Sequence, residues 1–250
     1  MKTSNNTILI TGGGSGIGLE IAKVYSQFGN TVVITGRNEQ KLKLAAQQLE
    51  GVDYIVSDIT NKNEVDALVT RIQRDYQNLN VLINNAGQAF LHNIAYSPNA
   101  EELARQEMET NYFATVGLTA RLLPILKKQQ EAAIVNVSSI VAFAPGLTLP
   151  TYSASKAALH SYTQALRLSL KTDSAVKVFE LMPPLVDTEF ARDIQSDKKI
   201  SPSEVAEALI RSMETDNYEV RVASAQSFYT NFLSQADKAV LALNGLQLTN

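Results

Sequence analysis

The sequence predicts an α/β fold, a single Rossmann-like, doubly wound parallel sheet with helices on both faces. Short apolar runs alternate with helical stretches along most of the 250 residues. The predicted strands are continuous apolar runs rather than alternating apolar and polar residues, which is typical of parallel strands covered on both faces. Because no linker, low-complexity tract or internal repeat divides the chain, one domain spanning residues 1–250 is expected.

The first half of the chain supplies the first predicted strands and helices. The strands are short apolar runs at Thr7–Thr11, Thr31–Thr35, Tyr54–Val56 and Val81–Ile83. The helices between them are predicted at Gly16–Phe28, Glu39–Leu49 and Lys62–Tyr76. Gly29 and Asn30 end the first helix. In the third helix, apolar residues recur at the spacing of a buried face, at Val65, Leu68, Val69 and Ile72.

The second half continues the alternation. A long helical region is predicted from about Asn99 to Lys128. Pro124 should kink or interrupt this helix, because proline lacks the N–H group of a helical hydrogen bond. A strand at Ala133–Val137, a helix at Tyr152–Lys171 and a strand at Val176–Leu181 follow.

The last part of the chain is less regular. Ser201, Pro202 and Glu204 predict a helix start, with a serine cap, proline at the first helical position and glutamate at the third. A short strand near Tyr218–Val222 and a last helix at about Ser227–Leu243 are also expected.

Composition limits the partners and the chemistry. Hydrophobic residues make up 45 % of the chain, enough for a full core. A net charge of −3 argues against nucleic acid or an anionic membrane as partner, since both require a basic face. The sequence has no cysteine, and with His92 and His160 as its only histidines no metal site is expected. Met1–Asn6 has no signal-peptide core, and no run approaches the roughly 20 apolar residues of a membrane span, so a cytoplasmic protein is expected.

Tyr152 and Lys156 are a candidate pair for proton transfer. They lie four residues apart in a predicted helix and therefore share one face. A free tyrosine has a pKa of about 10, and a fixed positive charge nearby favours the phenolate. Such a pair suits a proton donor or acceptor for an alcohol and a carbonyl. Similar pairs also occur on many solvated helix faces, so the interpretation depends on the rest of the chain.

A glycine-rich loop, Thr11–Gly18, joins the first strand to the first helix. Glycines allow a sharp turn and a close approach to a ligand. The helix N-terminus offers free N–H groups and the positive end of the helix dipole, which suit a pyrophosphate. The alternative is a tight turn without a ligand. The spacing is G-x-x-x-G-x-G rather than the G-x-G-x-x-G of the dinucleotide-binding fingerprint.

Taken together, these motifs resemble the short-chain dehydrogenase/reductase family. The matching pieces follow the family's order and spacing over Thr7 to about Thr188, namely Thr11-Gly12-x-x-x-Gly16-x-Gly18, Asn84–Gly87, Asn111, Ser139 and Tyr152-x-x-x-Lys156. Three further segments resemble the family members encoded alongside the teichoic-acid D-alanylation genes of Gram-positive bacteria: Asn5–Thr7, Ala157–Ser161 and Met182–Thr188.

The resemblance implies a set of catalytic residues. Tyr152 resembles the family's acid/base, and Lys156 the residue that lowers the tyrosine pKa and binds the nicotinamide ribose. Ser139 resembles the hydroxyl that holds the substrate oxygen, with Ser138 as a competing candidate. Asn111 resembles the residue that positions a water for proton relay. The alternatives are that Asn111 caps or kinks its helix and that Ser139 is a strand-end turn residue.

The resemblance also implies a nicotinamide cofactor. The expected contacts are Gly12, Gly14, Ser15, Gly16, Ile17, Gly18, Arg37, Asp58, Ile59, Asn85, Ala86, Gly87, Tyr152, Lys156, Pro183, Val186 and Thr188. Gly36 stands where NAD-preferring relatives carry an acid, and Arg37 could pair with a 2′-phosphate, which favours NADP(H) over NAD(H). A solvated loop arginine is the alternative, and Ser15 supplies no second basic residue. Pro184 replaces a family glycine, which puts the path of its loop in question.

The expected function is that of an NADP(H)-dependent oxidoreductase that interconverts a carbonyl compound and an alcohol, with reduction as the physiological direction. The alternative is a nucleotide-binding sensor or scaffold with little turnover. A substrate lid is expected at about residues 190–215, although a solvated loop fits Phe190–Ile200 equally well, and a variable C-terminal segment at 216–250. The expected assembly is a homodimer or homotetramer through the two long helices. The pocket is expected to include Phe90, Leu91, His92, Phe143, Ala144, Pro145 and Leu147.

Overall fold

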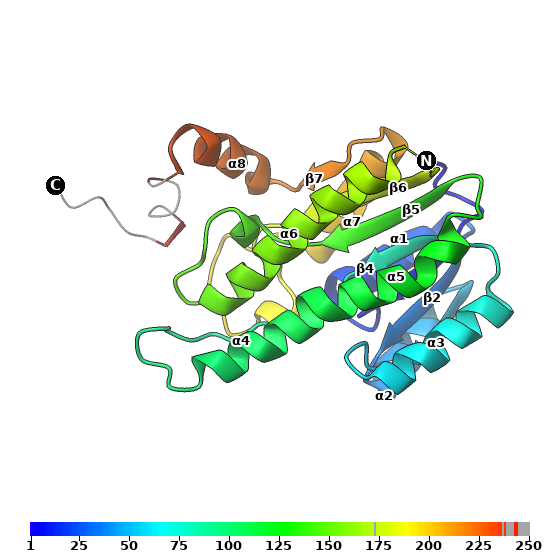
Figure 1. Cartoon of the computed structure of the whole chain (residues 1–250), viewed down its shortest axis with the longest axis horizontal. Coiled ribbons are helices and arrows are strands. Elements are labelled where there is room, and N and C mark those ends of the chain that lie inside the picture. Colours follow the sequence, from blue (N-terminus) through cyan, green and yellow to red (C-terminus); the bar gives the residue numbers. More distant parts are fainter. Residues whose placement is uncertain (173, 237, 239–242, 245–250) are drawn as a thin grey trace.

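The computed structural model describes residues 1–172, 174–236, 238 and 243–244. Within them, seven parallel strands form one sheet in the order β3-β2-β1-β4-β5-β6-β7 (Figure 1). The predicted α/β class with a parallel sheet is confirmed. The strands are β1 Thr7–Thr11, β2 Thr31–Gly36, β3 Val52–Val56, β4 Leu79–Asn84, β5 Ala132–Val137, β6 Val176–Met182 and β7 Glu219–Arg221.

Helices cover both faces of the sheet, as predicted. Their bounds are α1 Gly16–Gln27, α2 Glu39–Gln48, α3 Lys62–Asp75, α4 Ala100–Met108, α5 Ala114–Leu126, α6 Pro150–Leu170, α7 Pro202–Glu214 and α8 Ser224–Ser234. Side chains of α1, α2 and α7 share one core cluster with the sheet, and those of α3, α5 and α6 share the other. Neighbouring residues of β1, such as Ile8 and Leu9, face opposite clusters and are both fully buried. Burial on both faces is why the strands read as continuous apolar runs.

The long helical region is one rod beside α6 (Figure 1). It consists of α4, a π-helical segment at Glu109–Phe113 and α5. Pro124 does not interrupt it, contrary to that part of the prediction, because α5 continues to Leu126. Pro124 and Ala120 are both exposed, so water can reach the Ala120 carbonyl that loses its helical partner. The irregularity falls instead in the π-helical segment, a feature frequent at functional sites.

The C-terminal elements partly agree with their predictions. Ser201 caps α7 by accepting a hydrogen bond from the Glu204 N–H at 3.2 Å. The last helix begins three residues earlier than predicted and ends at Ser234. Of the stretch predicted to continue it to Leu243, residues 237 and 239–242 lie outside the described part of the chain. None of the helices that the structure describes combines the length and hydropathy needed to cross a lipid bilayer.

The sheet topology fixes where a ligand can bind. β1 lies between β2 and β4, so the connections that leave β1 and β4 run to opposite faces. In open α/β sheets, a crevice forms at this point, outside the carboxyl ends of the strands.

Candidate active site

A cavity of about 910 Å³ opens at the carboxyl ends of the strands. This volume is at the upper end of the range for small-molecule and cofactor pockets. Of the catalytic and cofactor-binding residues predicted from the sequence, all line the cavity except Gly18 and Asn111. The lining residues are Gly12, Gly14, Ser15, Gly16, Ile17, Arg37, Asp58, Ile59, Asn85, Ala86, Gly87, Ser139, Tyr152, Lys156, Pro183, Val186 and Thr188.

The glycine-rich loop presents an open helix end to this cavity. Ser15 precedes α1 but makes no side-chain cap, and the first turn contains no acidic residue. The first N–H groups and the positive dipole end are therefore available to an anion. Gly12 and Gly16 have φ values of +65° and +55°, which favour glycine. The Asn85 amide donates to the carbonyls of Thr11 at 2.9 Å and Gly12 at 3.2 Å, so β4 holds the loop in place. This end of the cavity fits the pyrophosphate of a dinucleotide.

The ends of β2 and β3 supply the residues predicted for the adenosine. Arg37, Asp58 and Ile59 line the cavity there. The Asp58 carboxylate accepts hydrogen bonds from the N–H of Thr60 at 2.9 Å and its hydroxyl at 2.7 Å. These bonds fix the carboxylate at the edge of the cavity.

Ser57 and Lys41 are among the cavity residues in this region that the sequence analysis missed. The Ser57 hydroxyl is buried and has no hydrogen-bond partner among the described residues. Lys41, in the first turn of α2, forms an ion pair with Glu189. No local pattern pairs Lys41 with Glu189, because they are 148 residues apart in sequence. The position of Lys41 just after the Asn38 cap was the one available signal.

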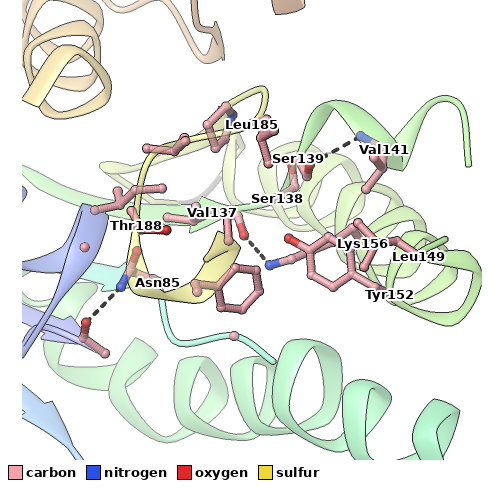
Figure 2. A pocket seen from close by; sticks show the side chains of 18 of the residues that line it. Asn85, Val137, Ser138, Ser139, Val141, Leu149, Tyr152, Lys156, Leu185 and Thr188 are labelled. Atoms are coloured by element: carbon pink, nitrogen blue, oxygen red, sulfur yellow. Dashed lines mark hydrogen bonds between the residues drawn. The ribbon is translucent and has the colours of Figure 1, made fainter. Parts of the chain in front are cut away.

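Tyr152, Lys156 and Ser139 meet at the end of β5 (Figure 2). The Lys156 Nζ donates to the Val137 carbonyl at 2.7 Å and lies 5.6 Å from the centre of the Tyr152 ring. The Ser139 hydroxyl lies near the Tyr152 phenol, whose pKa it lowers, and accepts from the Val141 N–H at 3.3 Å. The neighbouring Ser138 hydroxyl instead donates to Glu180 at 2.5 Å. The geometry therefore favours Ser139 over Ser138 as the hydroxyl beside the phenol.

Asn111 lies behind this group, in the π-helical segment. Its side chain is fully buried, and its oxygen accepts from the Gln88 N–H at 2.8 Å. Its amide donates to the Gln88 carbonyl and the Ser155 hydroxyl, both at 2.8 Å. A Cβ added at Gly87 would lie 3.3 Å from the Asn111 oxygen and 3.7 Å from the Lys156 Nζ, so Asn111 and Lys156 approach each other there. These bonds tie α6 to the end of β4.

Burial controls the ionisation of the central pair. It raises the pKa of Tyr152, a shift that the Ser139 hydroxyl opposes and the Glu107 carboxylate increases. Burial also lowers the pKa of Lys156 to about 8, against the opposing charge of Glu180. In this structure burial outweighs the groups that lower the Tyr152 pKa, and the expected effect of Lys156 on that pKa stays a prediction. Both side chains leave water, and this loss of hydration penalises the charged form of each.

The segment after β6 closes the other side of the cavity. Pro184 stands where the family has glycine. Val186, two residues later, nevertheless forms an isolated parallel bridge with Ile200, and the Ile200 carbonyl accepts a hydrogen bond from the Asp187 N–H at 2.8 Å. The Phe190 ring lies 6.0 Å from that of Tyr152. In contrast, α7 packs on α1 and contributes to the core. A lid therefore stays a proposal only for residues 190–200.

The substrate side of the cavity is lined mostly by other residues than those predicted. Leu147 lines it, whereas Leu91 and His92 line a separate pocket with Thr148 and Ile194. The other four predicted residues line neither of these two pockets, namely Phe90, Phe143, Ala144 and Pro145. Residues of α8 line the cavity instead, including Ser224, Ser227, Phe228 and Asn231. The C-terminal sequence has no regular pattern from which this contribution of α8 to the cavity could have been predicted.

Glu107 is a buried carboxylate next to the site, and its effect on stability can be predicted. It accepts from the Phe90 N–H at 2.7 Å and is fully buried. Burial raises its pKa above the ordinary 4.5, and the Thr151 hydroxyl and the Phe90 N–H oppose this. A raised carboxyl pKa contributes stability that is complete below pH 4.5 and is lost as the pH rises through the folded-state value. Gln cannot ionise, so Glu107→Gln should gain stability relative to the wild type as the pH rises.

Thermal unfolding from pH 4 to pH 8 measures this difference. The Tm of Glu107→Gln minus that of the wild type should increase with pH and then level off. A difference in Tm that is the same at every pH would contradict the assignment.

Comparison with known proteins agrees with this geometry. The family model for short chain dehydrogenases matches residues 6–199. The uncharacterized oxidoreductase DltE of Bacillus subtilis (strain 168) is 46% identical over 190 residues, which cover 75% of this chain and 74% of that protein. The resemblance inferred from the sequence motifs, including the narrower one to D-alanylation-associated members, is thus confirmed.

Solved structures give the same result. A short chain dehydrogenase from Burkholderia cenocepacia J2315 in complex with NADP has a TM-score of 0.86 at 28% identity and covers 100% of both chains. The 3-ketoacyl-(acyl-carrier-protein) reductase from Brucella melitensis, complexed with NADH, has a TM-score of 0.78 at 27% identity, covering 84% of this chain and 91% of that one. The chain therefore belongs to the short-chain dehydrogenase/reductase family of oxidoreductases.

Proposed function

We propose that the protein is an NADP(H)-dependent oxidoreductase that interconverts a carbonyl compound and an alcohol, with Tyr152 as the acid/base. The observation that carries this proposal is the position of the Tyr152 phenol. It lies beside Ser139 and Lys156, in the cavity that also contains the open N-terminus of α1. A nicotinamide, when bound, supplies or accepts the hydride.

The side chains of this chain handle the proton and the substrate oxygen. The Ser139 hydroxyl holds the oxygen in reach of the phenol, and Tyr152 donates the proton as the carbonyl is reduced. Without that proton, negative charge would develop on a buried oxygen, which is costly. Since burial raises the pKa of Tyr152, the phenol stays protonated near neutral pH, which suits a donor and supports reduction as the physiological direction.

Two basic side chains support NADP(H) as the cofactor. Arg37 and Lys41 line the adenosine end of the cavity, and Gly36 means that the end of β2 carries no acid to repel a 2′-phosphate. The relatives with solved structures include one in complex with NADP and one with NADH. The preference of this chain therefore depends on its own residues.

Removing either basic side chain should weaken NADPH binding selectively. A hydrogen bond to a charged group contributes about 1.5–3 kcal/mol, so Arg37→Ala or Lys41→Ala should raise the Kd for NADPH by roughly 10- to 100-fold. The Kd for NADH should change little, since NADH lacks the 2′-phosphate. Fluorescence titration with both cofactors measures the two values. Lys43→Ala is the matched control, because Lys43 is exposed on α2 and does not line the cavity. Equal losses for both cofactors would contradict the 2′-phosphate assignment.

A cofactor-consumption screen tests the proposed function. Wild-type protein and Tyr152→Phe are compared over ketones, aldehydes and sugars, with NADPH and with NADH. Oxidation of NADPH that requires Tyr152 is the expected result. Binding of NADPH without any Tyr152-dependent oxidation would overturn the proposal. The cytoplasmic location and the homodimer or homotetramer stay predictions from the sequence.

A further inference from the structure

The reactive face of α6 continues beyond Tyr152 and Lys156. His160 follows Lys156 by the same four residues, so the three side chains form one stripe along the helix. The His160 Nδ1 lies 2.9 Å and 3.0 Å from the two carboxylate oxygens of Glu180 on β6. The Ser138 hydroxyl donates to the same carboxylate at 2.5 Å. Glu180 is fully buried, and the proposed chemistry gives it no role.

A buried carboxylate is costly unless it is paired. Ser138 and His160 supply the partners of Glu180 from two different elements. The Phe143 ring stands edge-on to His160, with ring centres 5.0 Å apart, and the Tyr229 ring packs on Phe143 at 4.6 Å. The Phe143 ring covers one side of His160, and the Glu180 carboxylate is fully buried, so the pairing is shielded from water at its carboxylate end.

Glu180, His160 and Ser138 form a hydrogen-bonded cluster. This cluster contacts the site through the end of β5. Ser138 directly precedes Ser139, and its N–H donates to the Leu181 carbonyl of β6 at 2.9 Å. Val137, one residue earlier, holds the Lys156 Nζ through its carbonyl (Figure 2). A movement of Glu180 or Ser138 would therefore shift Ser139, which follows Ser138 in the chain. It would also shift Val137, whose carbonyl binds the Lys156 Nζ.

Charge is the second connection between the cluster and the site. Lys156 is 3 % exposed, and burial favours its neutral amine. The Glu180 carboxylate acts in the opposite direction and favours the ammonium. The other titratable neighbours are Tyr152 and His160 on α6, while Glu107 on α4 acts on Tyr152. Glu180 is thus the acidic group that favours a charged Lys156.

We propose that Glu180, held by His160 and Ser138, is a positioning residue that keeps Lys156 as an ammonium ion and fixes the end of β5 that carries Ser139. The inference rests on the proposed function only where it assigns Lys156 to cofactor binding. The ionisation of Lys156 itself can be measured without any cofactor.

Competitive labelling with acetic anhydride, read at Lys156 by mass spectrometry, measures the fraction of neutral amine at each pH. In the wild type the labelling midpoint should lie near pH 8. Glu180→Gln removes the charge and keeps the shape, and should lower the midpoint by about one pH unit. Glu180→Asp keeps the charge and should restore most of the shift. Glu219→Gln is the matched control, because Glu219 pairs with Glu180 in the strand register but faces Arg167 and Arg221.

NADPH binding from pH 6 to pH 9.5 provides a second measurement. At pH 6 Glu180→Gln should bind as the wild type does. At pH 8 it should bind about fivefold more weakly, because a midpoint one unit lower leaves about a tenth of Lys156 charged instead of half. A loss that is equal at every pH would indicate a merely structural role and would overturn the proposal, as would an unchanged labelling midpoint.

A variant at His160 covers the case in which Glu180→Gln does not fold. His160→Gln removes the ring that holds the Glu180 carboxylate in place. The carboxylate can then move relative to Lys156, and the Lys156 midpoint should fall by a smaller amount. An unchanged midpoint in His160→Gln would then overturn the proposal. If the wild type binds no NADPH while the labelling midpoints shift as expected, the proposed function fails and this inference stands.

Discussion

Tyr152→Phe is expected to lower kcat for carbonyl reduction by roughly 10²- to 10⁴-fold, the usual contribution of a general acid or base. The substitution removes the hydroxyl and keeps the ring that packs 6.0 Å from Phe190. Ser139 still reaches the substrate oxygen, so binding of the carbonyl is retained while the proton donor is lost. The Kd for NADPH should change little, because the open helix end of α1 and the loop after β6 are untouched. Steady-state kinetics and fluorescence titration measure the two quantities.

Tyr162→Phe is the matched control for this experiment. Tyr162 lies on the same helix, packs edge-on against the Tyr112 ring and does not line the cavity. It should keep the wild-type kcat, since its hydroxyl has no access to the substrate. If Tyr152→Phe keeps its kcat while Tyr162→Phe behaves as the wild type does, another group must supply the proton. Loss of NADPH binding together with turnover in Tyr152→Phe would show that the phenol supports the fold instead.

Strand positions were predictable because burial on both faces leaves a local pattern. β1 has the predicted bounds, and β2 extends a single residue beyond its predicted end. β3 and β4 were predicted too short. Asp53 and Asn80 interrupt their apolar runs. The ladder of β2 and β3 continues through Asp53, whereas Asn80 lies at a register shift in the ladder of β1 and β4. A polar residue inside a strand is recognisable only from the neighbours it pairs with.

Site residues were predictable where they belong to a local motif. Tyr152 and Lys156 share a helix face, which the spacing alone indicates. Glu180 could not be predicted, since its partners His160 and Ser138 are 20 and 42 residues away. The net direction of the Tyr152 pKa shift was not predictable for a related reason. Spacing indicates a nearby cation, but only the fold determines how much water the phenol loses.

Gly18→Ala should weaken NADPH binding by more than tenfold and lower the stability of the protein. A Cβ at this position would lie 2.5 Å from both the Gly12 carbonyl oxygen and the Asn85 Nδ2, closer than real contacts allow. The Gly12 oxygen belongs to the backbone, and Asn85 is held by its bonds to Thr11 and Gly12. Neither group can turn away without releasing the loop.

The helix cannot move away from the added methyl either. Ile21, Ala22 and Tyr25 are at most 1 % exposed and hold α1 against the sheet and α7. The glycine loop must therefore deform where the pyrophosphate is expected to bind. Overpacking of this kind costs about 1–3 kcal/mol, and each kcal/mol lowers Tm by about 2–4 °C in a domain of this size.

Gly117→Ala separates this collision from the general effect of alanine in a helix. Gly117 lies inside α5, and its added Cβ would meet only the end of the Arg121 side chain at 3.2 Å, which can move. Alanine favours a helix by about 1 kcal/mol over glycine, so this variant should be at least as stable as the wild type. Thermal unfolding and NADPH titration of both variants measure the contrast. Wild-type affinity in Gly18→Ala would mean that the loop tolerates the methyl, and that the close packing of α1 on Gly12 and Asn85 is not needed to form the cofactor site.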